Sequence, residues 1–362
     1  MKRKMSILAL MLALVLTLVA CGGKDQPAPE VEDGEEVEAS DLKIGMVTDE
    51  GGINDESFNQ SAWEGLQRVQ EELGITTKYQ ESKQEADFVQ NFETLLDAEF
   101  DLMWGVGYKL SGATYDAAIN NPDRKYGIVD FSYEGNDDFP KGTPENVVGV
   151  IFHDEQSSFL AGYVAGHTTE TNKVGFVGGQ KGVVIGKFEN GYNAGVKYAA
   201  KELGKEIEVL NQYADSFGDA AKGKAIASSM FQKGADIVFH AAGGVGNGVI
   251  EAAKEADKWA IGVDRDQNDL APDHVLTSVI KRVDVAVYNV AKDLKDGKFE
   301  GGKTLLYGLE HDGAVGLAAT SDKNVKPEIL EKVKVIEEKI VAGEIVPPID
   351  AENYEKFIAE LK

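Results

Sequence analysis

Cysteine is almost absent from this sequence of 362 residues, in which Cys21 is the only one. A lone cysteine cannot form a structural disulfide within its own chain, and it offers neither redox chemistry nor a thiolate metal site. Histidine is also scarce. None of the five lies near another at the spacing of metal ligands: His153, His167, His240, His274 and His311. The sequence therefore predicts no metal site.

Signatures of catalysis are missing as well. The sequence contains no Gly-x-Ser-x-Gly nucleophile elbow and no phosphate-binding Walker A motif. It also lacks the early aspartate cluster of the form Asp-x-Asp-x-x-x-Asp-Asp that a calcium-dependent nucleoside hydrolase needs. We therefore expect a binding protein rather than an enzyme, and no cofactor.

Basic residues are too few to balance the acidic ones, with 37 Lys and Arg against 62 Asp and Glu, which gives a net charge of −25. Residues 1–20 carry three basic groups and no acid, so the rest of the chain carries −25 − 3 = −28. This charge argues against a nucleic-acid partner and against electrostatic docking on anionic lipid. The solubility of an exposed protein is sufficient to explain it.

Long apolar runs are confined to the N-terminus. Lys2, Arg3 and Lys4 precede an apolar stretch over residues 5–20 that is too short to span a bilayer comfortably, so residues 1–20 are predicted to be a signal peptide. The stretch ends in Leu-Val-Ala-Cys21-Gly, which resembles the bacterial lipobox. We expect lipidation at Cys21, whose two acyl chains suffice for stable anchoring. The expected location is the extracytoplasmic face of the cell membrane, which the protein would contact through the lipid anchor only.

Residues 21–40 are rich in Gly, Pro, Asp and Glu and nearly devoid of large apolar side chains, which indicates a disordered acidic tether. The remaining residues exceed what one core usually serves, so two lobes are expected. The N-terminal lobe would comprise residues 41–152 and be completed by about 282–310. The C-terminal lobe would comprise 153–281 and be completed by about 311–362.

The folded region alternates short β-branched runs with helical patterns, which is typical of parallel sheets covered by helices. We predict an α/β fold of two Rossmann-like lobes with a ligand cleft between them, and chain crossings near Phe152, Lys281 and Glu310. Ligands of open parallel sheets bind beyond the carboxyl ends of the strands. The residues expected there are Asp49, Gly107, Asp130, Gly179, Phe217, Gly243 and Asp264.

One glycine-rich motif invites a cofactor interpretation. Residues 243–248, Gly-Gly-Val-Gly-Asn-Gly, follow a predicted strand and open a helix, and Asp264 lies roughly 20 residues on, as in a dinucleotide fingerprint. The spacing is Gly-x-Gly-x-Gly, however, whereas the dinucleotide fingerprint is Gly-x-Gly-x-x-Gly, with two residues before the last glycine. It favours a loop whose backbone amides approach a polar ligand at a helix N-terminus.

Five ordered motifs resemble one known family. The longest is Val47-Thr-Asp-Glu-Gly-Gly-Ile-Asn-Asp-Glu-Ser-Phe-Asn-Gln-Ser-Ala-Trp-Glu-Gly65, and the others are Val174-Gly-Phe-Val-Gly-Gly179, Ser216-Phe-Gly-Asp-Ala-Ala-Lys-Gly-Lys224, Ala241-Ala-Gly-Gly244 and Ala260-Ile-Gly-Val-Asp-Arg-Asp-Gln267. They are similar to motifs of the basic membrane protein family, the purine nucleoside receptor lipoproteins of ABC importers. The resemblance spans roughly residues 42–346. It implies a type I periplasmic-binding-protein fold with a hinged cleft, a nucleoside ligand, permease and ATPase partners, and a monomer.

The resemblance also implies a site. Phe58 and Phe217 would sandwich the base, and Asp49, Asp264 and Lys281 would hold the ribose. Asp130 would face the base edge, with Asp154 as the alternative acid, and Asn59 and Gly244 would make minor contacts. The residue types suit these roles, because bases stack on aromatic rings and carboxylates accept hydrogen bonds from vicinal hydroxyls.

Other interpretations remain open from the residues alone. Phe58 also fits the apolar face of a core helix, Phe217 a hydrophobic staple, the aspartates turn or cap positions, and Lys281 a solvated strand end. A ribose or galactose receptor of the same fold would use similar residue types. No feature of the sequence favours the further alternative, a surface protein that binds a host.

Overall fold

The computed structural model describes residues 38–311 and 313–361, which all fall within one compact unit, Val37–Lys362. The predicted signal peptide, Cys21 and most of the predicted tether lie outside the described residues. Within the described part, no helix is both long and apolar enough to cross a membrane.

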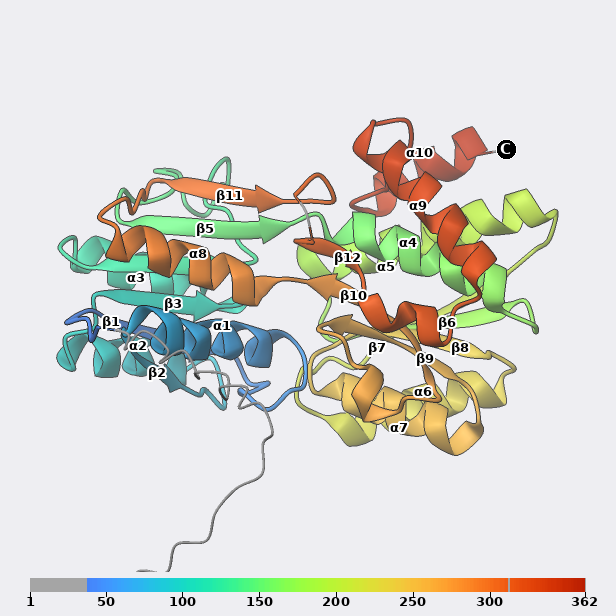
Figure 1. The fold of residues 1–362 in the computed structure, drawn as a ribbon, viewed down its shortest axis with the longest axis horizontal. Coiled ribbons are helices and arrows are strands. Elements are labelled where there is room, and N and C mark those ends of the chain that lie inside the picture. The colour runs from blue at the N-terminus through green and yellow to red at the C-terminus, as the bar shows by residue number, and fades with distance from the viewer. Residues whose placement is uncertain (1–37, 312, 362) are drawn as a thin grey trace, which may run out of the picture. The chain divides into compact units, whose positions relative to one another are not determined.

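Two six-stranded sheets organise the unit (Figure 1). The first has the order β11-β5-β4-β3-β1-β2 and is wholly parallel: β1 (Lys43–Thr48), β2 (Thr76–Gln80), β3 (Leu102–Val106), β4 (Lys125–Val129), β5 (Val147–Phe152) and β11 (Lys303–Tyr307). The second has the order β12-β10-β9-β8-β6-β7: β6 (Lys173–Gly178), β7 (Glu208–Tyr213), β8 (Ile237–Ala241), β9 (Trp259–Asp264), β10 (Val275–Lys281) and the antiparallel β12 (Val315–Leu317). The predicted α/β architecture of two Rossmann-like lobes is confirmed.

The central strands are buried on both faces, as expected for parallel sheets between helical layers. Side chains alternate between two core clusters along β1, where Ile44 and Met46 join one cluster and Val47 the other. The edge strand β2 has the sequence TTKYQ and is half exposed. The apolar runs of the sequence therefore position the sheet centres, whose carboxyl ends carry the site.

Helices cover each sheet. The N-terminal lobe, built on the first sheet, carries α1 (Phe58–Leu73), α2 (Asp87–Asp97), α3 (Ser111–Asn120) and α8 (Val283–Lys295), and α8 packs along α1. The C-terminal lobe, built on the second sheet, carries α4 (Asp154–Thr168), α5 (Val183–Leu203), α6 (Ala220–Gln232), α7 (Val245–Ala256), α9 (Pro327–Val341) and α10 (Ala351–Leu361). Short 3₁₀ turns lie in three of the connections: η1 (Tyr108–Leu110) before α3, η2 (Asn268–Leu270) between β9 and β10, and η3 (Ala319–Lys323) before α9.

Helix α4 cannot be recognised from a helical period in the sequence. Its residues are buried almost all round, so no polar face creates a helical period. It crosses α5 at backbone contact: a Cβ on Gly162 would lie 2.1 Å from the Tyr192 carbonyl oxygen, and one on Gly195 would lie 2.0 Å from that of Phe159. The glycines permit a crossing that larger residues would prevent.

The two sheets correspond strand by strand, and the chain passes between them after β5, after β10 and after β11. Asp130 and Asp264 occupy equivalent positions at the ends of β4 and β9. Both adopt the left-handed backbone conformation, with φ of 66°. This conformation is uncommon for residues other than glycine, although aspartate is among those that tolerate it. The sheet ends thus present two equivalent carboxylates, one from each lobe.

Candidate functional site

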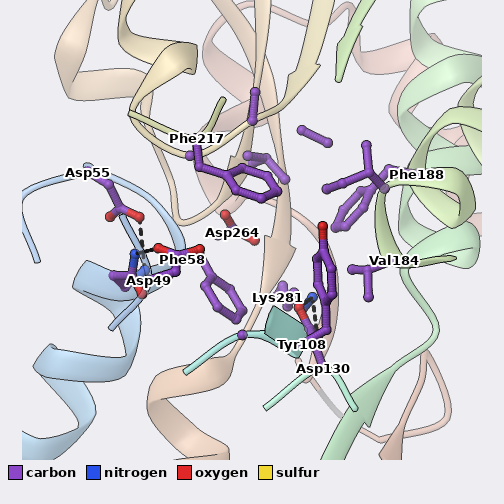
Figure 2. Close-up of a pocket in the computed structure, with 17 residues that line it drawn as sticks. Asp49, Asp55, Phe58, Tyr108, Asp130, Val184, Phe188, Phe217, Asp264 and Lys281 are labelled. Carbon is purple, nitrogen blue, oxygen red and sulfur yellow. Dashed lines mark hydrogen bonds and ion pairs between the residues drawn. The ribbon is translucent and has the colours of Figure 1, made fainter. Parts of the chain in front are cut away.

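A cavity lies between the lobes at the carboxyl ends of the strands (Figure 2). Its empty space is about 510 Å³, part of which is open to solvent. The N-terminal lobe contributes Asp49, Asp55, Phe58, Asn59, Gly107, Tyr108 and Asp130. The C-terminal lobe contributes Val184, Ile185, Phe188, Phe217, Ala241, Ala242, Gly243, Val263, Asp264 and Lys281. Since both lobes supply its walls, opening the lobes would dismantle the cavity.

The structure brings together all the ligand-binding residues that the sequence suggested except Gly244, and it places Gly243 in the lining instead. Gly244 caps the start of α7. A Cβ there would meet the Phe217 carbonyl oxygen at 3.3 Å and Asp55 at 3.9 Å, so these two residues cover it.

Several lining residues were missed from the sequence. Tyr108 follows the expected strand-end residue Gly107, so its position could have identified it. It reaches the other lobe, because a Cβ on Gly182 would lie 3.4 Å from the Tyr108 hydroxyl. Val184 and Ile185 belong to the first turn of α5, which begins at Val183.

Two phenylalanine rings enter the cavity from opposite lobes. Phe58 starts α1, and Phe217 lies in the loop between β7 and α6. Both rings are half-buried and also contact the edge of the core. The Phe217 ring lies against Gly179, where a Cβ would come within 2.3 Å of its Cε1 atom. A glycine at residue 179 therefore leaves the room that this ring occupies.

Lys281 is a buried cation and not a solvated strand end, since only 1 % of it is exposed. Its Nζ lies 2.7 Å from each carboxylate oxygen of Asp130 and 3.1 Å from Asp154 Oδ1. Burial alone would lower the pKa of Lys281, but Asp130, Asp154 and Asp264 outweigh it and raise that pKa. Burial raises the pKa of Asp154 despite the neighbouring lysine. Asp154 does not line the cavity.

Three more carboxylates have environments of their own. Asp49 Oδ1 accepts from Asn59 Nδ2 at 2.8 Å and from the Gly51 amide at 3.0 Å, and burial raises the pKa of this acid. Asp55 accepts from backbone amides at the start of α1, including that of Asn59 at 3.0 Å, while burial raises its pKa to about 6. Burial also raises the pKa of Asp264 to about 7, and the Ser57 hydroxyl donates to its Oδ2.

This arrangement can hold a molecule with a flat apolar part and several hydroxyl donors. The rings offer stacking faces, and the carboxylates offer acceptors but no donors when ionised. Among residues 38–311 and 313–361, no cluster of His, Cys, Asp and Glu has the composition of a metal site.

Comparison with known proteins places this geometry in context. Residues 42–350 match a family described as "ABC transporter substrate-binding protein PnrA-like". The chain is 43% identical to a CD4+ T-cell-stimulating antigen of Listeria innocua, covering 96% of this chain and 99% of the relative. It is 39% identical to the ABC transporter nucleoside-binding protein BmpA of Lactococcus lactis, with coverage of 96% and 99%.

A solved structure agrees with the fold. An ABC transporter solute-binding protein from Aeropyrum pernix K1 superposes with a TM-score of 0.78 at 27% identity, covering 88% of this chain and 97% of that protein. The expected two-lobed binding-protein fold is thereby confirmed.

Proposed function

Because the chain belongs to the PnrA-like family of ABC transporter substrate-binding proteins, we propose that it captures nucleosides, preferentially purine nucleosides, outside the cell membrane. It would then deliver them to a permease driven by an ATPase. The observation that carries this proposal is the pair Phe58 and Phe217, which enter one cavity from opposite lobes beside buried carboxylates. Each stacking face is worth about 1–3 kcal/mol toward a base.

The apolar part of the cavity favours a nucleoside over a free sugar. Val184, Ile185, Phe188 and Val263 line it together with the two phenylalanines. A sugar presents hydroxyls around its whole ring, and those facing these side chains would lose water without gaining partners. A nucleoside instead divides into an apolar base and a polar ribose, as the cavity does. The Lactococcus lactis relative is named as a nucleoside-binding protein, which supports the same choice.

The residue roles follow from chemistry. We assign Asp49 and Asp264 to the ribose hydroxyls, with Lys281 balancing their charge. Of the two acids considered for the base edge, only Asp130 lines the cavity, and we assign it that role. Asn59 acts mainly through Asp49, to which it donates a hydrogen bond. Gly243 replaces Gly244 as the glycine that borders the ligand.

Thermal unfolding with candidate ligands tests the proposed ligand class. Adenosine, guanosine or inosine at 100 times the dissociation constant should stabilise the protein by about 2.7 kcal/mol, which corresponds to about 4 °C in Tm. Free ribose should have no effect, because it lacks the base. Adenosine monophosphate should also have none, because its phosphate would meet the acidic side chains.

Phe217→Ala is the matching variant. It removes one stacking face and should weaken purine nucleosides by roughly 1–3 kcal/mol, and pyrimidine nucleosides by less, since a smaller base has less overlap to lose. A thermal shift with ribose or galactose and none with any nucleoside would instead establish a sugar receptor.

The lipid anchor is a separate part of the proposal. Cys21 follows small and apolar residues at the end of the N-terminal apolar stretch, as in a lipobox. Cys21→Ala should abolish labelling by palmitate and release the protein from the membrane fraction. Palmitate incorporation that persists in this variant would exclude Cys21 as the attachment site.

A further inference from the structure

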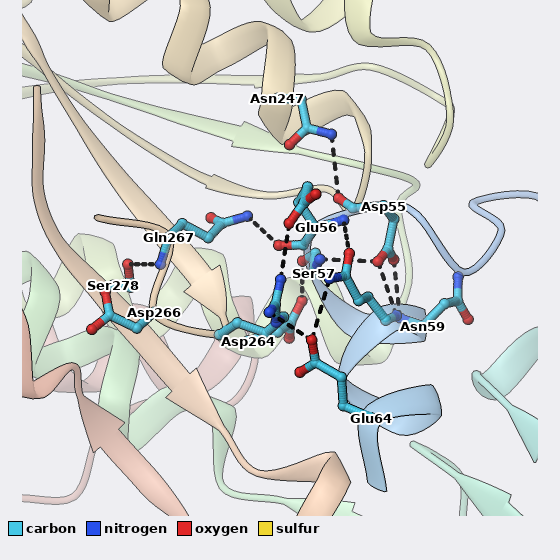
Figure 3. Close-up of polar contacts among 12 residues, drawn as sticks. Asp55, Glu56, Ser57, Asn59, Glu64, Asn247, Asp264, Asp266, Gln267 and Ser278 are labelled. Atoms are coloured by element: carbon cyan, nitrogen blue, oxygen red, sulfur yellow. Dashed lines mark hydrogen bonds and ion pairs between the residues drawn. The ribbon is translucent and has the colours of Figure 1, made fainter. Parts of the chain in front are cut away.

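One short segment of the N-terminal lobe, Asp55–Ser57, makes three hydrogen bonds to the C-terminal lobe (Figure 3). Asn247 Nδ2 donates to the Asp55 carbonyl oxygen at 3.3 Å, and Gln267 Nε2 donates to that of Glu56 at 2.7 Å. The Ser57 hydroxyl donates to Asp264 Oδ2. Neither Glu56, Ser57, Asn247 nor Gln267 lines the ligand cavity.

Arg265 adds a charged connection at the same place. Its two terminal nitrogens bind two acids of the opposite lobe, Glu56 Oε2 at 2.9 Å and Glu64 Oε1 at 2.7 Å. The arginine side chain is 26% exposed and the acids about 40%. Water therefore screens each pair, and the pairs act by holding the lobes in one geometry more than by raw strength.

Both sides of this contact are held in place by their own lobe. Asp55 accepts from the amides of Ser57 and Asn59 at 2.9 and 3.0 Å, which fixes the segment against the start of α1. Glu56 adopts the left-handed backbone conformation, with φ of 56°, and its carbonyl oxygen accepts the hydrogen bond from Gln267 Nε2.

The orientation of the Gln267 amide is set by the buried centre of the C-terminal lobe. Gln267 is 2% exposed, and its Oε1 accepts from the Val263 amide at 2.9 Å and lies 3.0 Å from His240 Nε2. Burial lowers the pKa of His240 to about 4, so the ring is neutral and its Nε2 proton can complete the bond. With Oε1 occupied in this way, the amide nitrogen must face Glu56.

We propose that Asp55–Ser57 and Glu64, together with Asn247, Arg265 and Gln267, form a closure clasp that sets ligand affinity. Asp55 lines the cavity but joins the clasp through its carbonyl oxygen, and no other member of the clasp lines the cavity. The contacts of the closure clasp join different lobes, so they exist only when the lobes are closed. They raise the closed population and slow the release of any ligand held inside. Ser57 adds a positioning role, since its hydroxyl fixes one oxygen of Asp264. The proposal deepens the proposed function but does not depend on the identity of the ligand.

Arg265→Gln is the direct test, with Arg68→Gln as the matched control. Arg68 pairs with Glu72 at 2.9 Å within α1, so its loss breaks an exposed ion pair that does not cross the cleft. Spin labels on Glu93→Cys in α2 and Ala225→Cys in α6, both exposed, report the separation of the lobes in a Cys21→Ser background, where no other cysteine competes.

Arg265→Gln should shift the label distances of the ligand-free protein toward longer values, while Arg68→Gln matches the parent. Adenosine should dissociate about three- to tenfold faster from Arg265→Gln, with an unchanged association rate. Label distances that are identical in Arg265→Gln and the parent would overturn the closure clasp. If adenosine fails to bind the parent, the nucleoside proposal falls, but the label distances still decide on the closure clasp.

Discussion

Lys281→Met should destabilise the protein by about 3–5 kcal/mol at pH 8, because it leaves two buried carboxylates without their cation. Asp130 lies 2.7 Å and Asp154 3.1 Å from the lysine nitrogen, and all three side chains are at most 7% exposed. Methionine matches the lysine side chain as far as Cε, so the loss reports mainly the missing charged group. Urea denaturation at pH 8 measures it.

The same substitution predicts a pH dependence. Burial already raises the pKa of Asp154 to about 7. Without the lysine, this buried carboxylate can lose its unpaired charge only by binding a proton in the folded protein. The folded variant then binds more protons than the unfolded chain. The loss of unfolding free energy relative to the parent should therefore become smaller as the pH falls from 8 to 5.

Lys173→Met provides the comparison. Lys173 pairs with Glu208 at 2.9 Å, but the two side chains are 28% and 57% exposed. Its loss should cost about 0–1 kcal/mol at either pH. If Lys281→Met costs no more than Lys173→Met, the buried cation does not stabilise the site.

Asp264→Asn should stabilise the folded protein and at the same time weaken its binding of nucleosides. Burial raises the pKa of Asp264 to about 7, so the folded state favours the neutral carboxyl group. The penalty for the charged form is absent below about pH 4, where both states are protonated, and complete above pH 7. Asparagine removes it, and the gain at pH 8 should be on the order of 2–4 kcal/mol.

Binding should suffer at the same time, because a neutral amide accepts more weakly from ribose hydroxyls than a carboxylate does. We expect adenosine and cytidine to weaken alike by about 10- to 100-fold, since they share the ribose. Calorimetric titration at pH 8 measures both. Unchanged adenosine affinity would show that Asp264 does not hold the sugar.

Asp236→Asn separates this effect from burial alone. Asp236 is 6% exposed, as is Asp264, but it lies outside the cavity and accepts from the Thr169 hydroxyl at 2.6 Å and the Glu170 amide at 2.7 Å. Its loss should destabilise the protein by about 1–3 kcal/mol and leave nucleoside binding unchanged.

Much of the site could be predicted because it lies in local sequence. Strand ends can be recognised from the apolar runs that precede them, and Asp49, Asp130 and Asp264 follow such runs directly. The motif around Phe58 is long enough to identify by resemblance. These features need only the strand period and the rule that ligands bind at carboxyl ends.

The remainder depends on contacts between distant residues. Nothing near Ser57 indicates that it meets Asp264, because more than 200 residues separate them in sequence. Lys281 has the pattern of an ordinary strand end, and only the fold shows that two acids and three aromatic rings enclose it. Helix α4 lacks an amphipathic period because it is buried on nearly all sides, so its sequence does not indicate a helix.

The interleaved path of the chain makes each lobe dependent on the other. Strand β11 pairs with β5, and α8 packs on α1. In the chain, however, α8 and β11 come after five of the six strands of the second sheet, and only β12 comes later. A fragment ending at residue 281 would leave the β5 edge unpaired and the apolar face of α1 uncovered. During synthesis, the first lobe therefore cannot finish folding before residue 307 has been made. Neither lobe can therefore be separated from the other as one continuous segment of the chain.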